Sequence, residues 1–181
     1  MVLPYGNNMF DDLRVLYTED EIQNRIMELA ARIDGDYANC EDVVVVSILN
    51  GAMFFTIDLL KKMKTYAILD TLQASSYLGT ESTDNVIIKK DIDVDIKGKD
   101  VIIVEDIIDS GRTLQVIKEH LLKKEPKSLK IAVLLDKPER RKYEVDVDYV
   151  GYTIPNKFVV GYGFDVDGKG RNIPYIGYLD N

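Results

Sequence analysis

The sequence contains one cysteine, one histidine and no tryptophan among its 181 residues. Cys40 has no second cysteine to pair with, so a disulfide within the chain is excluded and a reducing compartment is expected. Cys40 and His120 together supply too few sulfur and nitrogen ligands for a zinc site. We interpret Cys40 as a bystander and His120 as a surface or helix-end residue.

Long apolar runs and net positive charge are missing as well. No window reaches the apolar length of a membrane span, and the N-terminus lacks the basic-then-apolar order of a secretory signal. The 23 Lys and Arg residues face 31 Asp and Glu, which gives a net charge of −8. Nucleic acids and anionic membranes select basic surfaces, so neither is an expected partner. The chain is predicted to be cytoplasmic, with a single domain over residues 1–181.

Strand and helix patterns alternate from residue 43 to residue 135. Apolar, β-branched runs predict buried strands at 43–49, 66–72, 101–104 and 129–135. Helical periodicity predicts helices at 22–33, from 54 to about 64 and from 114 to about 124. This order indicates an α/β fold with a mainly parallel central sheet flanked by helices, and ligands at the carboxyl ends of the strands.

The boundaries of these elements are predicted from local signals. The first helix should open with a capping box made by Thr18 and Glu21, and end at Gly35 in the left-handed conformation. Residues 73–85 are small and polar without an apolar period, which predicts a long loop that is either a functional lid or disordered. Further strands are expected at 86–89, 145–150 and 158–162.

The stretch from Val101 to Leu114 carries the strongest functional signal. A buried strand ends in small and polar residues, and a helix follows at once. The first N–H groups of a helix have no internal partner, and the helix dipole adds partial positive charge there, so this geometry favours a phosphate. Ser110, Gly111 and Thr113 would supply close backbone approach and hydroxyl donors.

Three acids beside a phosphate site need a second explanation. Glu105, Asp106 and Asp109 make sense if the ligand also carries hydroxyl groups, a divalent cation or a base to protonate. The alternative is an ordinary turn with surface acids. The glycine spacing excludes both a P-loop and a dinucleotide-binding fingerprint.

This motif resembles that of a known family. Residues 105–113 resemble the phosphoribosyl-pyrophosphate signature of type I phosphoribosyltransferases, and Val-Glu-Asp-Ile-Ile-Asp-Ser-Gly is the form found in hypoxanthine-guanine phosphoribosyltransferases. Residues 134–141 and 150–163 resemble the purine-binding region of that family, and residues 171–177 resemble the tail of its bacterial members. The resemblance runs from about Val43 to the C-terminus.

The resemblance implies a fold and a reaction. The fold would add a small hood, built from the N-terminal segment and about 155–181, and a flexible lid loop. Hypoxanthine or guanine would attack the anomeric carbon of phosphoribosyl pyrophosphate, giving IMP or GMP and Mg²⁺-bound pyrophosphate. Members of this family are usually homodimers or homotetramers, so one of these states is expected.

The resemblance also assigns roles to single residues. Asp109 would be the general acid/base for the imidazole nitrogen of the purine. Glu105 and Asp106 would contact the ribose hydroxyls and magnesium, and Asp165 a second magnesium. The remaining roles are phosphoribosyl binding by Ser110, Gly111, Arg112 and Thr113; pyrophosphate binding by Asn50, Gly51 and Arg171; lid closure by Ser76 and Tyr77; and purine binding by Lys137, Phe158, Val159 and Asp165.

Three positions depart from the family pattern. Asn50 stands where Lys or Arg is usual, which removes a cation from the pyrophosphate loop, a loop that in this family tends to contain a non-proline cis peptide. Val166 stands where a tyrosine is usual, and Gly170 where an aromatic residue precedes the arginine. Gly168 and Gly170 should therefore loosen the segment that carries Arg171.

Alternatives remain for several assignments. Lys137 is either a solvated surface lysine or the donor to the oxo group of the purine, which would disfavour adenine. Phe158 is either ordinary core or a stacking residue. Residues 139–142 are either a solvated charge cluster or a subunit contact. For the whole chain, the rivals are a phosphoribosyltransferase for another base such as xanthine, and a non-catalytic regulator that senses phosphoribosyl pyrophosphate and binds RNA.

Overall fold

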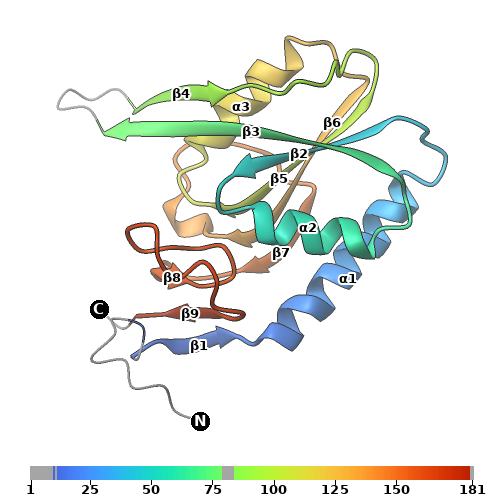
Figure 1. Ribbon diagram of the computed structural model, residues 1–181. Coiled ribbons are helices and arrows are strands. Elements are labelled where there is room, and N and C mark those ends of the chain that lie inside the picture. The colour runs from blue at the N-terminus through green and yellow to red at the C-terminus, as the bar shows by residue number, and fades with distance from the viewer. Residues whose placement is uncertain (1–9, 11, 79–83, 180–181) are drawn as a thin grey trace.

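The computed structural model describes residue 10, residues 12–78 and residues 84–179, with the side chains of 76–78, 84 and 85 left aside. A six-stranded sheet with the order β4-β3-β2-β5-β6-β7 forms its centre (Figure 1). All neighbours are parallel except β3 and β4. The strands of this sheet are β2 (Val43–Leu49), β3 (Ala67–Leu78), β4 (Asp84–Lys90), β5 (Asp100–Ile108), β6 (Ser128–Asp136) and β7 (Tyr149–Thr153).

Helices cover both faces of this sheet, because alternate side chains of each buried strand point to opposite sides. Val45 and Ile102 pack with helices α1 (Glu19–Asp36) and α2 (Met53–Lys62) on one face. Val46 and Ile103 pack with α3 (Arg112–Leu122) on the other. The predicted α/β fold with a mainly parallel sheet is therefore confirmed. No helix within the described residues is long and apolar enough to cross a membrane.

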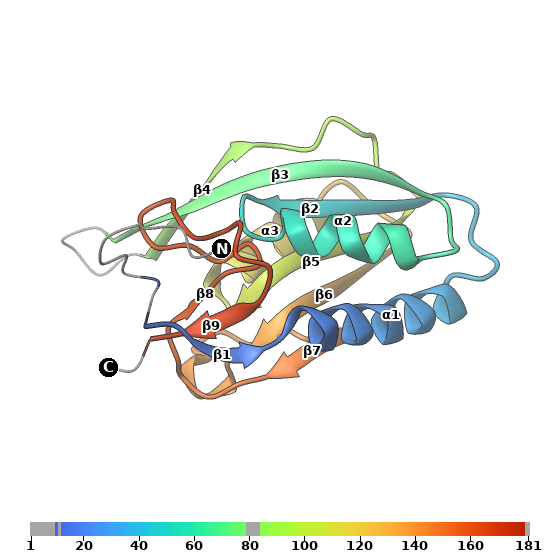
Figure 2. The same ribbon diagram turned by 60° about the horizontal axis from the view of Figure 1, so that its bottom comes forward.

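A second, three-stranded sheet stands beside the carboxyl ends of the central strands (Figure 2). Its order is β1-β9-β8, with β1 (Arg14–Tyr17), β9 (Ile176–Tyr178) and β8 (Val159–Val160), and both of its pairings are antiparallel. It joins a segment near the start of the chain to segments near its end. The strand predicted over 158–162 is shorter than expected because Gly161 and Tyr162 have φ angles of 98° and 48°, which end the extended backbone.

Helix α1 begins as predicted and ends later than predicted. The Thr18 side chain accepts from the Glu21 N–H at 3.3 Å, and the Glu21 carboxylate accepts from the Thr18 N–H at 2.8 Å, so the capping box is confirmed. The left-handed cap at Gly35 is wrong. The helix continues to Asp36 because Tyr37, only 3% exposed, packs into the core and donates its N–H to the Ile33 carbonyl at 2.9 Å.

The loop predicted over 73–85 is also wrong in its larger part. β3 extends to Leu78 and pairs with β4, so Gln73–Leu78 and Asp84–Lys90 form an antiparallel ladder. Residues 79–83 lie outside the described residues. The small polar side chains gave no apolar alternation, but pairing satisfies the backbone groups, and this is what makes the segment a strand.

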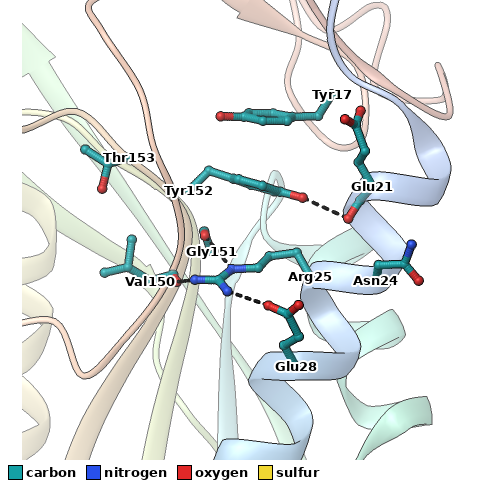
Figure 3. Close-up of a pocket in the computed structure, with 9 residues that line it drawn as sticks. All are labelled: Tyr17, Glu21, Asn24, Arg25, Glu28, Val150, Gly151, Tyr152 and Thr153. Atoms are coloured by element: carbon teal, nitrogen blue, oxygen red, sulfur yellow. Dashed lines mark hydrogen bonds and ion pairs between the residues drawn. The ribbon is translucent and has the colours of Figure 1, made fainter.

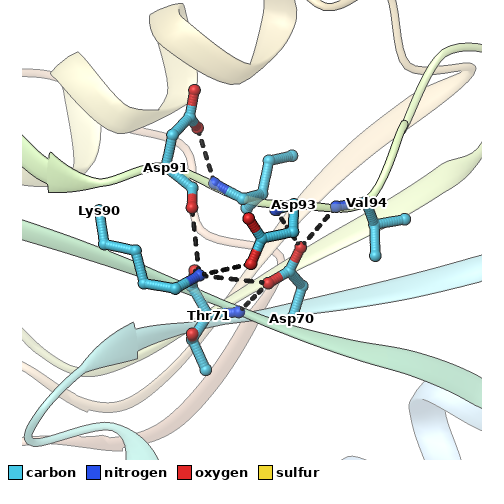
Figure 4. A network of polar contacts seen from close by, with 7 residues as sticks. Asp70, Thr71, Lys90, Asp91, Asp93 and Val94 are labelled. Carbon is cyan, nitrogen blue, oxygen red and sulfur yellow. Dashed lines mark hydrogen bonds and ion pairs between the residues drawn. The ribbon is translucent and has the colours of Figure 1, made fainter.

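A buried carboxylate holds the chain that leaves β4. Asp70 on β3 is 8% exposed and accepts the backbone N–H groups of Thr71, Asp93 and Val94 at 2.6, 2.7 and 2.8 Å (Figure 4). The Lys90 ammonium lies 3.6 Å from the same carboxylate. Burial acts to raise the pKa of Asp70, but these donors outweigh it and the pKa lies below its ordinary value.

The exposed edge of the central sheet is covered by α1. Arg25 donates from Nε to the Gly151 carbonyl at 2.6 Å and from Nη2 to the Val150 carbonyl at 3.1 Å (Figure 3). The Tyr17 and Tyr152 rings stack with centroids 3.8 Å apart. A cavity of about 570 Å³ remains here, but Arg25 already pairs with Glu28 and the Glu21 carboxylate accepts from Thr18, so we assign it a structural role that protects the β7 edge.

β7 begins four residues later than the strand predicted from Val145. Its ladder with β6 starts at Ala132 and Tyr149. Asp148 stands just before it, and its carboxylate accepts the Ile131 N–H at 2.8 Å in place of a strand carbonyl. Val145 and Val147 pack against the core from outside the sheet. The alternation of apolar residues here therefore reflects burial of these side chains and not pairing of the backbone with β6.

Candidate active site

The carboxyl ends of β2, β5 and β6 bring the predicted site residues to one edge of the sheet. Ser47 pairs with Val104, and Ile108 pairs with Asp136. The loop after β2, the turn after β5 and the residue after β6 therefore lie beside one another. Figure 1 shows the second sheet beside this edge.

The turn between β5 and α3 forms a cavity of about 150 Å³. Gly111 has a φ of 88°, and a Cβ on it would come 2.6 Å from the Tyr143 carbonyl oxygen, so only glycine fits. The Arg112 N–H points toward Ser110 Oγ at 3.4 Å. The cavity thus lies at the N-terminus of a helix, where backbone N–H groups face outward. Its lining consists of residues 105–111, Thr113 and Leu114.

Two adjacent carboxyl groups form one wall of this cavity. Glu105 is 9% exposed, and its Oε1 accepts the Asp106 N–H at 3.1 Å. Asp106 accepts the Ile107 N–H at 2.7 Å. Burial, with the neighbouring Asp106 charge, raises the pKa of Glu105 well above its ordinary value, and burial raises the pKa of Asp106 despite Arg171 nearby. Such a pair favours a cationic partner.

The loop after β2 packs directly against this wall. A Cβ on Gly51 would lie 1.6 Å from Asp106 Oδ2 and 3.5 Å from Arg171 Nη1. The cis peptide expected in this loop is present between Leu49 and Asn50. The Asn50 side chain is exposed. The structure therefore brings together Gly51, Asp106 and Arg171 from three separate parts of the chain.

Arg171 is held more firmly than we predicted from Gly168 and Gly170. Its Nη1 donates to the Gly163 carbonyl at 2.5 Å, and its Nη2 lies 2.5 Å from Asp165 Oδ1. Asp165 also accepts the Gly168 N–H at 2.7 Å. Gly168 and Gly170 adopt φ angles of 79° and 93° and shape a tight turn. The predicted loosening is wrong, because these contacts fix the segment.

Asp109 and Lys137 end the neighbouring strands β5 and β6. Asp109 is half-exposed, and its Oδ1 accepts from Arg140 Nε at 2.8 Å. Lys137 is 8% exposed, so the alternative of a solvated lysine is wrong. Burial lowers the pKa of Lys137, the Arg140 charge adds to this, and the Asp109 carboxylate opposes it. The pKa of Lys137 therefore depends on the charges of both Arg140 and Asp109.

Sequence reasoning missed the part played by residues 140–143. Residues 139–142 were predicted to be a solvated charge cluster or a subunit contact. Arg141 instead donates from Nε to the Asp109 carbonyl at 3.2 Å and from Nη2 to Asp136 at 2.5 Å. The only signal in the sequence was a run of cations that is separated from Lys137 by two residues. This signal did not identify the contact, because charge clusters on protein surfaces have the same composition.

The other predicted residues do not line the cavity at the start of α3. Phe158 is 50% exposed beside β8, so its alternative as a core residue is wrong, and Val159 is buried in the ladder with Tyr178. Ser76 and Tyr77 lie in β3 and not in a loop, while their side chains fall outside the described part of the chain.

A magnesium ion fits the chemistry of Glu105 and Asp106. Mg²⁺ usually takes one or two carboxylates and completes its shell with water and substrate phosphates, so no protein cage is required. Within the described residues, no group of three His, Cys, Asp or Glu forms such a cage. The buried, mutually repelling carboxyl pair supplies the donors. Asp165 fits less well, because Arg171 and Gly168 already occupy both of its oxygens.

The chain is similar to known proteins over most of its length. The family described as phosphoribosyl transferase domain matches residues 16–167. A hypoxanthine-guanine phosphoribosyltransferase from Aquifex aeolicus is 44% identical over 165 residues, which cover 91% of this chain and 93% of the relative. The solved structure of a hypoxanthine phosphoribosyltransferase from Staphylococcus aureus has a TM-score of 0.90 and 46% identity, and 97% of each chain is covered.

A third relative is much longer than this chain. The bifunctional protein TilS/HprT of Listeria monocytogenes is 45% identical over 177 residues. These residues cover 96% of this chain but only 27% of the relative. The chain thus spans about a quarter of the length of the bifunctional relatives that it matches.

Proposed function

Since the chain belongs to the phosphoribosyltransferase family, we propose that it transfers the phosphoribosyl group of phosphoribosyl pyrophosphate to hypoxanthine or guanine. The products are IMP or GMP and pyrophosphate. The observation that supports this best is the meeting of Gly51, Asp106 and Arg171 beside the cavity at the start of α3. This arrangement offers places for a phosphate, a leaving pyrophosphate and a divalent cation at one edge of the sheet.

The 5′-phosphate is assigned to the turn at the start of α3. The N–H groups of the first helical turn face outward, and the hydroxyls of Ser110 and Thr113 add donors. Gly111 lets the turn pack against Tyr143, because a Cβ there would strike the Tyr143 carbonyl. Glu105 and Asp106, on the cavity wall, accept from the ribose hydroxyls.

The leaving pyrophosphate is assigned to the loop after β2 and to Arg171. Backbone N–H groups near Gly51 and the planar guanidinium of Arg171 are suited to its oxygens. Mg²⁺, held by Glu105 and Asp106, would neutralise charge that develops on the departing pyrophosphate. With Asn50 in place of a lysine, this side of the site relies on Arg171 as its fixed cation.

The purine is assigned to the other side of the cavity. In the transfer, a ring nitrogen of the base forms a bond to the anomeric carbon while the bond to pyrophosphate breaks. Asp109 exchanges the proton of the imidazole nitrogen, and Lys137 donates to the oxo group. The exposed face of Phe158 is available to stack on the base. A buried ammonium that must be paired selects oxo-purines over adenine.

A panel of bases tests the function directly. We expect purified protein with Mg²⁺ and phosphoribosyl pyrophosphate to form nucleotide from hypoxanthine and guanine, with little from adenine. Nucleotide from xanthine alone would move the proposal to another base. Binding of phosphoribosyl pyrophosphate without turnover of any base would replace the enzyme with a sensing regulator.

We also propose a homodimer or homotetramer in the cytoplasm. The exposed apolar side chains of Met53 and Ile57 on α2, 45% and 39% exposed, support an oligomer. Light scattering at micromolar concentration tests it, and a monomer mass would contradict it.

A further inference from the structure

The segment 140–143 contacts three residues of the turn that carries Asp109, namely Asp109, Ser110 and Arg112. Arg140 Nε donates to Asp109 Oδ1 at 2.8 Å, and Arg141 Nε donates to the Asp109 carbonyl at 3.2 Å. The N–H groups of residues 142 and 143 both donate to the Ser110 carbonyl, at 2.9 and 3.0 Å. The Arg112 guanidinium lies 5.1 Å from the centre of the Tyr143 ring. Only the first of these contacts reaches a side chain that the proposed reaction uses directly.

The pair of Arg140 and Asp109 contributes little to folding. Their side chains are 51% and 42% exposed, and ion pairs at such exposure are weak because water competes with them. The turn is already held by the backbone contacts of residues 141–143. The Arg140 side chain is therefore free to serve another purpose than stability.

The contact leaves one oxygen of Asp109 available. Oδ1 is occupied by Arg140, and Oδ2 makes no hydrogen bond to any described residue. A carboxylate in a turn can rotate about two side-chain bonds, whereas a guanidinium Nε–H donates in one direction. A bond to Oδ1 thus restricts where Oδ2 points.

Lys137 makes this restriction important. It ends the strand beside Asp109, it is buried, and its pKa responds to the charges of both Asp109 and Arg140. Without Arg140, the Asp109 carboxylate would be free to pair with the Lys137 ammonium, whose charge it already influences. An ion pair between them would remove both groups from the base at once.

On the basis of the proposed function, we propose that Arg140 is a positioning residue for the purine half of the site. It holds Asp109 by Oδ1, so that Oδ2 faces the imidazole nitrogen of the base and Lys137 remains available for the oxo group. Arg140 does not touch the substrate in this proposal, but acts through Asp109.

The test compares Arg140→Ala and Arg140→Lys with Lys142→Ala. Lys142 is an exposed cation of the same segment whose N–H, and not its side chain, contacts Ser110. We expect Arg140→Ala to lower kcat for hypoxanthine by about 10- to 100-fold. The Kd of phosphoribosyl pyrophosphate, measured by calorimetry, should change less than about twofold. Arg140→Lys should recover part of kcat, and Lys142→Ala should keep it.

A second experiment separates action through Asp109 from a general effect. In the Asp109→Asn background, Arg140→Ala should lower kcat no further. Independent, multiplicative losses would overturn the proposal. So would an unchanged kcat in Arg140→Ala, an equal loss in Lys142→Ala, or a loss of phosphoribosyl pyrophosphate binding that parallels kcat. Melting curves show whether Arg140→Ala is folded. If it is not, the kcat of Arg140→Lys relative to the unsubstituted protein tests the proposal in its place.

The outcomes also separate this inference from the proposed function. If the unsubstituted protein forms nucleotide and Arg140→Ala does so equally fast, only the role of Arg140 is wrong. If the unsubstituted protein turns over none of the four bases, the proposed function is wrong and the role of Arg140 is wrong with it.

Discussion

The Cα of Gly51 lies against the carboxylate of Asp106, so closely that a Cβ would come 1.6 Å from Oδ2. The two residues belong to the loop after β2 and to the end of β5. Their contact joins the loop proposed for pyrophosphate to the carboxylate proposed for magnesium and ribose. A side chain at residue 51 would have to displace Asp106 or the loop itself.

Gly51→Ala is therefore expected to lower kcat/KM for phosphoribosyl pyrophosphate by about 100-fold, because small misplacements of reacting groups have effects of that size. The matched control is Gly35→Ala. Gly35 lies in α1 with nothing within 4 Å of its Cβ position. That substitution should raise stability by about 0.5–1 kcal/mol and leave kcat unchanged. Normal kinetics in Gly51→Ala would show that the loop is not part of the site.

Asp109→Asn should lower kcat by about 10²- to 10⁴-fold, the usual contribution of a general acid or base. The amide cannot exchange the proton but keeps the shape of the side chain. Phosphoribosyl pyrophosphate should bind with an unchanged Kd, which calorimetry measures. A variant as active as the unsubstituted protein would remove Asp109 from the mechanism.

Asn50→Lys should restore a fixed cation to the pyrophosphate loop. A hydrogen bond to a charged group contributes about 1.5–3 kcal/mol, so the inhibition constant for pyrophosphate should fall about tenfold or more. Product-inhibition kinetics measure it, and Asn50→Gln is the uncharged control. If the constant stays the same, residue 50 lies outside the site.

Asp70→Asn should lower the free energy of unfolding at pH 7 by about 1–3 kcal/mol, since an amide offers the three part-buried N–H groups one uncharged acceptor oxygen in place of two charged ones. The pKa of Asp70 is lower in the folded protein than its ordinary value of 3.8. The carboxylate therefore stabilises the fold fully above that ordinary value, and its contribution disappears as pH falls through the lower folded pKa.

Urea unfolding of both proteins at several pH values measures this difference. The gap between them should be wide at neutral pH and should narrow only in strongly acidic solution, below about pH 4. A gap that does not change with pH would show that charge on Asp70 is irrelevant to the network in Figure 4.

The sequence predicted the buried strands and the cavity turn well because both follow from local patterns. Val101 to Val104 is apolar on both sides, and Gly111 marks a backbone that no other residue can adopt. The capping box of Thr18 and Glu21 is likewise local. Elements of this kind need no knowledge of distant parts of the chain.

Predictions that depend on distant partners were less successful. β3 extends through residues 73–78 because β4 returns beside it, and α1 passes Gly35 because Tyr37 is buried in the core. Arg171 is fixed by Gly163 and Asp165, although the glycines beside it suggested freedom. The contact of Arg140 with Asp109 joins residues 31 positions apart, and charge composition alone did not reveal it.

The pairing of β1 with β9 has a consequence for synthesis on the ribosome. Translation produces β1 before the whole central sheet, whereas β9 is produced after it. The phosphate turn can thus fold on a nascent chain whose second sheet still lacks its middle strand. Synthesis of β9 is then the event that completes the second sheet beside the candidate active site.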